Sequence, residues 1–194
     1  MADITTRIGM PLDEFIELSN DQPFELINGE RIPKMPNVFG HSEMIRQLFL
    51  LLYGHTQVEQ SGEVYTETTF ILPDADDSNW VEGSRIPEVM FFAEDRVKQY
   101  KAAYPNHRTR PLALVPDLVI EVVSPTDKAT DLDNKIDAYL LDGVRLIWVL
   151  NPQSRKTTVH TPDLELPFHV KPDGVLDAGD VIPGFKISLS KLFE

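Results

Sequence analysis

Two glutamates stand inside apolar segments of the sequence, where a charged side chain is least expected. Glu121 lies within Leu-Val-Ile-Glu-Val-Val (residues 118–123), and Glu88 is the only charged group in residues 86–92. A carboxylate is costly to bury unless it is paired, hydrogen-bonded or bound to a metal. Each glutamate therefore marks either a site that satisfies its charge or, as the alternative, an edge strand that turns it toward solvent.

The two carboxylates lie side by side if their segments form neighbouring strands. They would then repel one another, and the pKa of one would rise unless a cation sat between them. Mg²⁺ or Mn²⁺ is the natural cation here, because both ions prefer oxygen ligands and the chain contains no cysteine. We therefore expect Glu88 and Glu121 to be metal ligands.

A lysine downstream of Glu121 offers a further positive charge. Lys135 follows Asp131 and precedes Tyr139 at helical spacing, beside the apolar stripe of a helix predicted over residues 127–141. This position lets Lys135 lean toward the sheet and the carboxylates. An ordinary surface ion pair with Asp131 is the alternative.

One histidine begins another predicted helix. His41 opens the segment over residues 40–53, and a helix N-terminus favours the neutral imidazole through the helix dipole. His41 could orient a water or contact a phosphate there, whereas a plain surface histidine is the alternative.

The elements that must position these residues follow from hydrophobic periodicity and turn signals. The predicted elements are helices over residues 11–18, 40–53 and 127–141, a hairpin over 24–32 turning at Asn28 and Gly29, strands over 63–72, 86–93, 112–123 and 144–150, a loop over 73–83, and short strands after 156. This order predicts a single α/β domain over residues 1–194, with a mixed central β-sheet flanked by helices and with extra C-terminal strands.

Charge and composition narrow the classes of partner. The 194 residues carry 18 Lys and Arg against 31 Asp and Glu, and a net charge of −13 argues against a general nucleic-acid coat protein. Residues 96–110 hold five Lys and Arg and no acid. They form either a solvated loop or a cationic arm for an anionic partner. We expect a cytoplasmic protein without membrane contact, because no signal peptide is visible and no apolar run approaches ~20 residues.

Several of these segments resemble one known family. They are residues 24–30 (Phe-Glu-Leu-Ile-Asn-Gly-Glu), His41 at a helix start, residues 86–89 (Ile-Pro-Glu-Val), residues 116–125 (Pro-Asp-Leu-Val-Ile-Glu-Val-Val-Ser-Pro), and Asp131 with Lys135 and Tyr139. Together they resemble the bacterial Uma-two family of restriction-endonuclease-like proteins, a branch of the PD-(D/E)XK nuclease superfamily. The resemblance implies a restriction-endonuclease-like mixed sheet with carboxylates on adjacent strands that hold a divalent metal.

The resemblance also assigns roles to individual residues. Glu88 takes the place of the superfamily's first Asp, and Glu121 takes the (D/E) place. Val123 stands where the superfamily has Lys, and Lys135 supplies the lysine from the following helix. The longer side chain of Glu88 shifts its carboxylate by more than ~1 Å, a displacement that can cost ~100-fold in rate.

The leading hypothesis is a metal-dependent endonuclease that hydrolyses DNA phosphodiester bonds. Glu88 and Glu121 would ligate Mg²⁺ or Mn²⁺, Lys135 and His41 would serve at the scissile phosphate, and residues 96–110 would contact DNA. The resemblance adds the expectation of a homodimer. Two alternatives stay open: a non-catalytic binding or assembly module that retains the nuclease fold, and a hydrolase for another phosphate ester such as a nucleotide.

Overall fold

The structure of the chain is a computed structural model that describes residues 7–125 and 127–194. The described helices are α1 (Leu12–Asp21), α2 (Phe39–Glu59), α3 (Glu94–Ala103), α4 (Ala129–Asp142) and α5 (Leu189–Leu192), with a 3-10 helix at His107–Thr109. The helices predicted over 11–18, 40–53 and 127–141 are confirmed as α1, α2 and α4. None of the helices in this described part is both long and apolar enough to cross a membrane.

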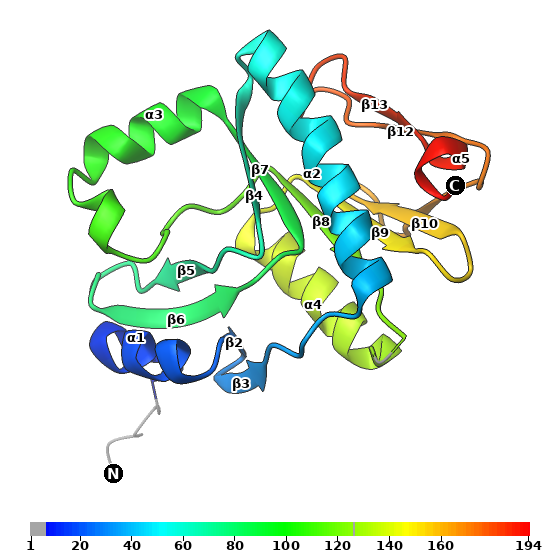
Figure 1. The fold of residues 1–194 in the computed structure, drawn as a ribbon. Coiled ribbons are helices and arrows are strands. Elements are labelled where there is room, and N and C mark those ends of the chain that lie inside the picture. Colours follow the sequence, from blue (N-terminus) through cyan, green and yellow to red (C-terminus); the bar gives the residue numbers. More distant parts are fainter. Residues whose placement is uncertain (1–6, 126) are drawn as a thin grey trace.

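A six-stranded sheet forms the centre of the molecule (Figure 1). Its strands, in spatial order, are β11 (Phe168–Val170), β10 (Lys156–His160), β9 (Leu146–Asn151), β8 (Leu118–Val122), β7 (Val89–Ala93) and β4 (Gly62–Thr66). The pair β8–β9 is parallel and the other pairs are antiparallel. The predicted mixed central sheet is therefore confirmed.

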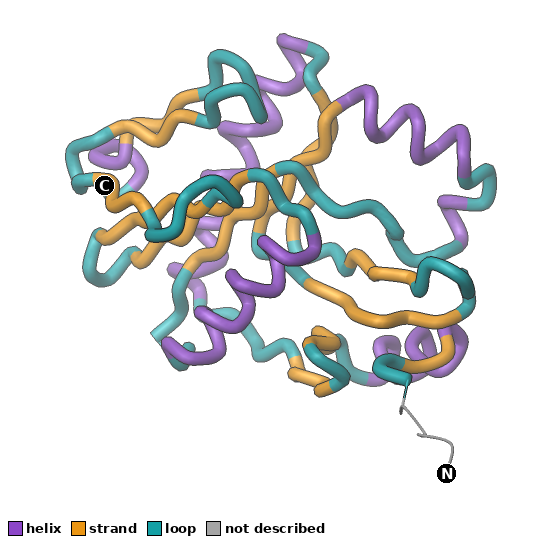
Figure 2. Tube along the Cα trace, turned by 180° about the vertical axis from the view of Figure 1, so that it is seen from behind, coloured by secondary structure: helices purple, strands orange, loops and turns teal. Residues whose placement is uncertain are grey.

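Helices α2 and α4 cover opposite faces of this sheet (Figures 1 and 2). Successive side chains of a strand point to opposite faces, and β8 follows this rule. Ile120 packs in the same buried cluster as Leu48 of α2, whereas Val119 packs with Ile136 and Tyr139 of α4. Glu121 follows Ile120 and therefore faces α4.

A smaller sheet lies beside the N-terminal helix. Its strands are β1 (Met10–Pro11), β6 (Trp80–Arg85), β2 (Phe24–Ile27) and β3 (Glu30–Pro33) in spatial order, with β5 (Phe70–Pro73) also paired to β6. The hairpin β2–β3 turns at Asn28 and Gly29, as predicted, and their φ angles of 52° and 81° are those of a type I′ turn.

Two sequence predictions are wrong at this smaller sheet. The single strand expected over residues 63–72 is in fact two strands, β4 and β5, which belong to different sheets. The extended conformation is interrupted at Glu67. This residue has a positive φ of 46° and donates its backbone N–H to the carbonyls of Pro87 and Glu88. Residues 73–83, expected as a loop, contribute most of β6, because pairing with β2 and β5 outweighs their weak local strand signal.

The C-terminal segment lies beside α2, on the same face of the central sheet (Figure 1). Strands β12 (Val175–Asp177) and β13 (Lys186–Ser188) pair with each other, and α5 follows directly. Ile187 and Leu189 are buried in the cluster that contains the inner face of α2. The extra C-terminal strands expected from the sequence are present.

Candidate functional site

The register of the central sheet brings Glu88 and Glu121 together. Val89 of β7 pairs with Ile120 of β8, so Glu88, which directly precedes β7, and Glu121 of β8 both lie next to this pair. Both glutamates are buried, with 6% and 5% of their surface exposed. The alternative that each points to solvent from an edge strand is therefore wrong.

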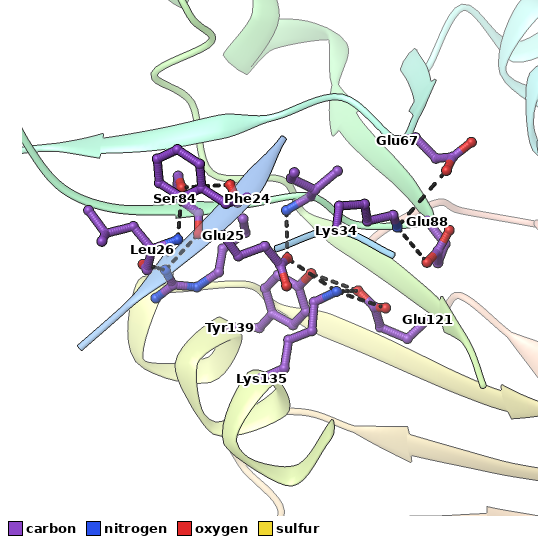
Figure 3. A network of polar contacts seen from close by, with 12 residues as sticks. Phe24, Glu25, Leu26, Lys34, Glu67, Ser84, Glu88, Glu121, Lys135 and Tyr139 are labelled. Atoms are coloured by element: carbon purple, nitrogen blue, oxygen red, sulfur yellow. Dashed lines mark hydrogen bonds and ion pairs between the residues drawn. The ribbon is translucent and has the colours of Figure 1, made fainter. Parts of the chain in front are cut away.

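Glu121 is held on both carboxylate oxygens. Tyr139 donates its hydroxyl to Oε1 over 2.6 Å, and Lys135 Nζ lies 3.1 Å from each oxygen (Figure 3). Burial raises the pKa of Glu121 to about 7, against the attraction of Lys135 and with a further rise from Glu88 and Glu25. Glu121 is thus a carboxyl that changes charge near neutral pH.

Glu88 is held by two groups from outside the central sheet. Lys34 Nζ lies 2.7 Å from Oε1, and Nε2 of His41 lies 3.2 Å from Oε2. Burial raises the pKa of Glu88, but His41 and Lys34 outweigh that effect and leave the pKa below its usual value. The contact with His41 lacks the alignment of a hydrogen bond, so Oε2 is a buried acceptor without a hydrogen-bond partner in the described chain.

His41 and Lys135 both lie against carboxylates of the site. His41 is 5% exposed and faces Glu88 from the first turn of α2, so the alternative of a surface histidine is wrong. The ammonium of Lys135 contacts the carboxylates of Glu121 and Glu25. Within the described residues no ion pair joins it to Asp131, so the surface-pair alternative is wrong as well.

The charge of Lys135 is stabilised by its surroundings. Burial alone would lower the pKa of Lys135, but the carboxylates of Glu121, Glu25 and Glu88 outweigh burial and raise the pKa well above its usual value. The ammonium therefore stays protonated throughout the neutral range.

Two members of the site were not predicted from the sequence. Glu25 of β2 accepts a hydrogen bond of 2.7 Å from the backbone of Ile86 and contacts Lys135 at 3.1 Å. Glu25 stands between the apolar residues Phe24 and Leu26, so its sequence context indicates a buried carboxylate just as that of Glu121 does. Lys34 follows β3 in an irregular connection, where a lysine gives no signal at all.

A buried arginine fixes the frame around Glu25. Arg85 donates from Nη1 to the carbonyl of Leu26 at 2.6 Å and from Nη2 to Asp142 at 3.1 Å. Burial raises the pKa of Asp142, and Arg85 opposes that rise, so that the pKa is about 6. Most of the Asp142 carboxylate is therefore ionised at pH 7. Through Arg85, strands β2 and β6 are tied to the end of α4.

We call Glu25, Glu88, Glu121, Lys34 and Lys135 the carboxylate–lysine cluster. Glu25 and Glu121 meet at Lys135 beside α4, and Glu88 lies on the other side of Glu121 at Lys34, as Figure 3 shows. In the described part of the chain, no three His, Asp or Glu side chains gather into a ready set of metal ligands. The carboxylates are instead held by ammonium groups, which a metal would have to replace in part.

The basic segment over residues 96–110 is mostly helical and lies away from this cluster. It begins in α3, which follows the end of β7 opposite to Glu88. Several of its cations already have partners: Arg96 pairs with the buried Asp117 at 2.9 Å, and Lys98 and Lys101 pair with other acids. The expected loop is therefore in large part a helix, with three of the five cations paired to acids, and contact of this segment with an anionic partner such as DNA stays a prediction.

Comparison with known proteins places the chain in a family. The family described as "Uma2: Putative restriction endonuclease" matches residues 12–190. The chain is also similar to the crystal structure of a putative nuclease belonging to DUF820 from Anabaena variabilis ATCC 29413, with a TM-score of 0.76 over 95% of this chain and 97% of that chain. At 20% identity this likeness shows a shared fold. No curated protein matches. Because the family match spans nearly the whole chain, the protein belongs to the Uma2 family.

Proposed function

We propose that this protein is a divalent-metal-dependent nuclease that hydrolyses phosphodiester bonds of DNA. The observation that carries the proposal is the pair Glu88 and Glu121, both buried and both next to the paired residues Val89 and Ile120, with Lys135 against Glu121. Membership of a family described as a restriction endonuclease supports the same chemistry.

The donor chemistry of the site fits Mg²⁺ or Mn²⁺. Mg²⁺ is commonly held by one or two protein carboxylates and completes its shell with waters and substrate phosphates. Glu88 and Glu121 would supply the two carboxylates, and Oε2 of Glu88, which lies 3.2 Å from His41 Nε2 without an aligned hydrogen bond, is an available ligand atom. When bound, such a metal offsets negative charge on the scissile phosphate and makes water more acidic.

The neighbouring side chains would hold charge and position. Lys135, with its pKa raised by three carboxylates, stays protonated and so serves as a fixed positive charge for the reacting phosphate, not as a base. Tyr139 fixes the orientation of Glu121 through its hydroxyl. His41 positions Glu88 from α2.

The direct test is cleavage of supercoiled plasmid with Mg²⁺ or Mn²⁺. We expect Glu121→Gln and Lys135→Met to lose about 100-fold or more in rate, because each removes a charge at the reacting centre. The matched control is Lys98→Met, since Lys98 is exposed and, among residues 7–125 and 127–194, pairs only with Glu94 on α3. Equal cleavage by the wild type, both variants and the control would overturn the proposal.

A second candidate is a non-catalytic binding or assembly module. One observation favours it: Lys34 and Lys135 already neutralise most of the buried carboxylate charge without a metal. Calorimetry with MnCl₂ separates the two candidates, because a purely structural cluster shows no binding that depends on Glu88 and Glu121.

Turnover of nucleotides without DNA would instead favour a hydrolase for small phosphate esters. The homodimer stays a prediction.

A further inference from the structure

Lys34 lies on the solvent side of the carboxylate–lysine cluster. It follows the last residue of β3 and precedes α2, in a connection without regular structure. Its backbone N–H donates to the carbonyl of Pro23 at 2.9 Å, which anchors the main chain. Its side chain is 19% exposed, whereas that of Glu88 is 7% exposed, so the ammonium approaches Glu88 from the solvent side.

The ammonium of Lys34 has one close acceptor and a second one within reach. It lies 2.7 Å from Glu88 Oε1 and 4.0 Å from Glu67 Oε1 (Figure 3). Glu67 is 45% exposed and is held in place by Asn37, whose amide donates to it at 2.7 Å. A small rotation of the lysine side chain would thus exchange a buried carboxylate for an exposed one.

The other lysine of the cluster is fixed much more firmly. Lys135 rises from the regular helix α4 and contacts both Glu121 and Glu25 at 3.1 Å. Its ammonium also lies 5.8 Å from the ring centre of Tyr139. Moving Lys135 would break all three contacts, whereas moving Lys34 breaks one. Lys34 is therefore the cation that can leave.

The charge of the cluster favours such an exchange. With all groups ionised, the three carboxylates exceed the two ammonium groups by one negative charge. A divalent cation added beside both lysines would leave the buried cluster with one excess positive charge. A divalent cation that replaces Lys34 would leave it neutral, and buried charges are stable only when they are matched.

We propose that Lys34 is an internal counter-ion that occupies Glu88 while the site is free of metal and moves to Glu67 when a divalent metal binds. This inference rests on the proposed metal site and adds to it a residue that regulates metal affinity. Lys34 is a positioning residue, since it acts through Glu88.

The experiment is calorimetric titration of metal-free protein with MnCl₂. Lys34→Met removes the ammonium and keeps most of the side-chain length, so the competing ion pair is lost. We expect Mn²⁺ to bind about 10-fold tighter than to the wild type, the factor that corresponds to one charge-assisted hydrogen bond. Lys34→Gln serves as the second variant if Lys34→Met does not fold. The control Lys98→Met should keep the wild-type affinity.

A double-mutant cycle with Glu67 separates the exchange from a general loss of positive charge. Glu67→Gln removes the charge that receives Lys34, so it should weaken Mn²⁺ binding in the wild-type background. In the Lys34→Met background the same change should have a much smaller effect, because no ammonium needs a new partner. Equal effects of Glu67→Gln in the two backgrounds would overturn the inference.

The outcomes also distinguish this inference from the proposed function. If Mn²⁺ binding depends on Glu121 but is not tightened by Lys34→Met or Lys34→Gln, the metal site stands and the role of Lys34 is refuted. If neither the wild type nor any Lys34 variant binds Mn²⁺, both proposals are refuted together.

Discussion

Removal of the Lys135 charge should destabilise the metal-free protein strongly and in a pH-dependent way. Lys135→Met keeps a long apolar side chain in place but leaves Glu121 and Glu25 without their shared cation. Breaking a buried ion pair by removing one partner costs about 3–5 kcal/mol. We expect a loss of this size at pH 8, where Glu121 of the wild type is ionised.

The pH dependence follows from the pKa of Glu121. That pKa is about 7 in the folded wild type, above the ordinary value of 4.5, and loss of the ammonium raises it further. A folded state that binds a proton more tightly than the unfolded chain loses stability as pH rises through the interval between the two pKa values. Ionisation of Glu121 stops lowering the stability of the wild type once the pH exceeds about 7, whereas in the variant it continues to lower the stability at higher pH. If Glu121 of the variant stays protonated up to pH 8, the gap between the two proteins widens by about 1.4 kcal/mol from pH 6 to pH 8.

Urea unfolding in the presence of a chelator measures this gap, since free energies extrapolated to water can be compared at each pH. The control Lys98→Met should lose less than about 0.5 kcal/mol at both pH values, because an exposed pair four residues apart on a helix contributes little. A loss for Lys135→Met that is equal at pH 6 and pH 8 would refute the coupling to Glu121. A loss below about 1 kcal/mol at pH 8 would refute the buried ion pair itself.

Three further predictions concern Glu121 of strand β8 and two side chains near this strand, Tyr139 and Asp117. Tyr139→Phe should cost about 1.5–3 kcal/mol in urea unfolding at pH 8, because it removes a buried donor to Glu121; an unchanged stability would contradict the hydrogen bond. Asp117→Asn, directly before β8, should cost about 1–3 kcal/mol of stability because its pair with Arg96 is lost. The Mn²⁺ affinity should stay unchanged, and a weakened affinity in calorimetry would contradict a purely structural role of Asp117. Mn²⁺ affinity of the wild type should rise with pH up to about 7 and then level off, because Glu121 must ionise to bind metal, and a flat profile from pH 6 to 8 would exclude Glu121 as a ligand.

The sequence predicts the half of the site that depends on local pattern. A lone carboxylate in an aliphatic strand marks Glu121, and the apolar stripe of α4 orients Lys135 toward the sheet. The family resemblance adds the pairing of Glu88 with Glu121, which periodicity alone leaves conditional on strand order. These signals work because a buried charge and an amphipathic helix each restrict the local structure.

The remaining half depends on contacts between distant segments, which local pattern does not carry. Glu25 reaches Lys135 only because β2 pairs with β6, and that pairing joins Leu26 to Ser84. The break at Glu67 separates two strands that read as one continuous alternation. Helix α3 was missed because it buries only Val97 and so shows no apolar stripe.

The parallel pair β8–β9 has a consequence for how the buried site is reached. Glu121 and Lys135 belong to the continuous unit β8–α4–β9 and lie 14 residues apart, whereas Glu25 and Lys34 come from the N-terminal hairpin. Units with fewer buried contacts open at lower free energy in the native state. Amide hydrogens of the exposed edge strand β3 should therefore exchange through a low-energy opening, and those of the buried strands β2 and β8 through a much higher one. Lys34 follows β3 directly, so opening of this edge strand alone would free the lysine from Glu88 while β2 and the central sheet stay folded, which gives ions access to Glu88 without global unfolding.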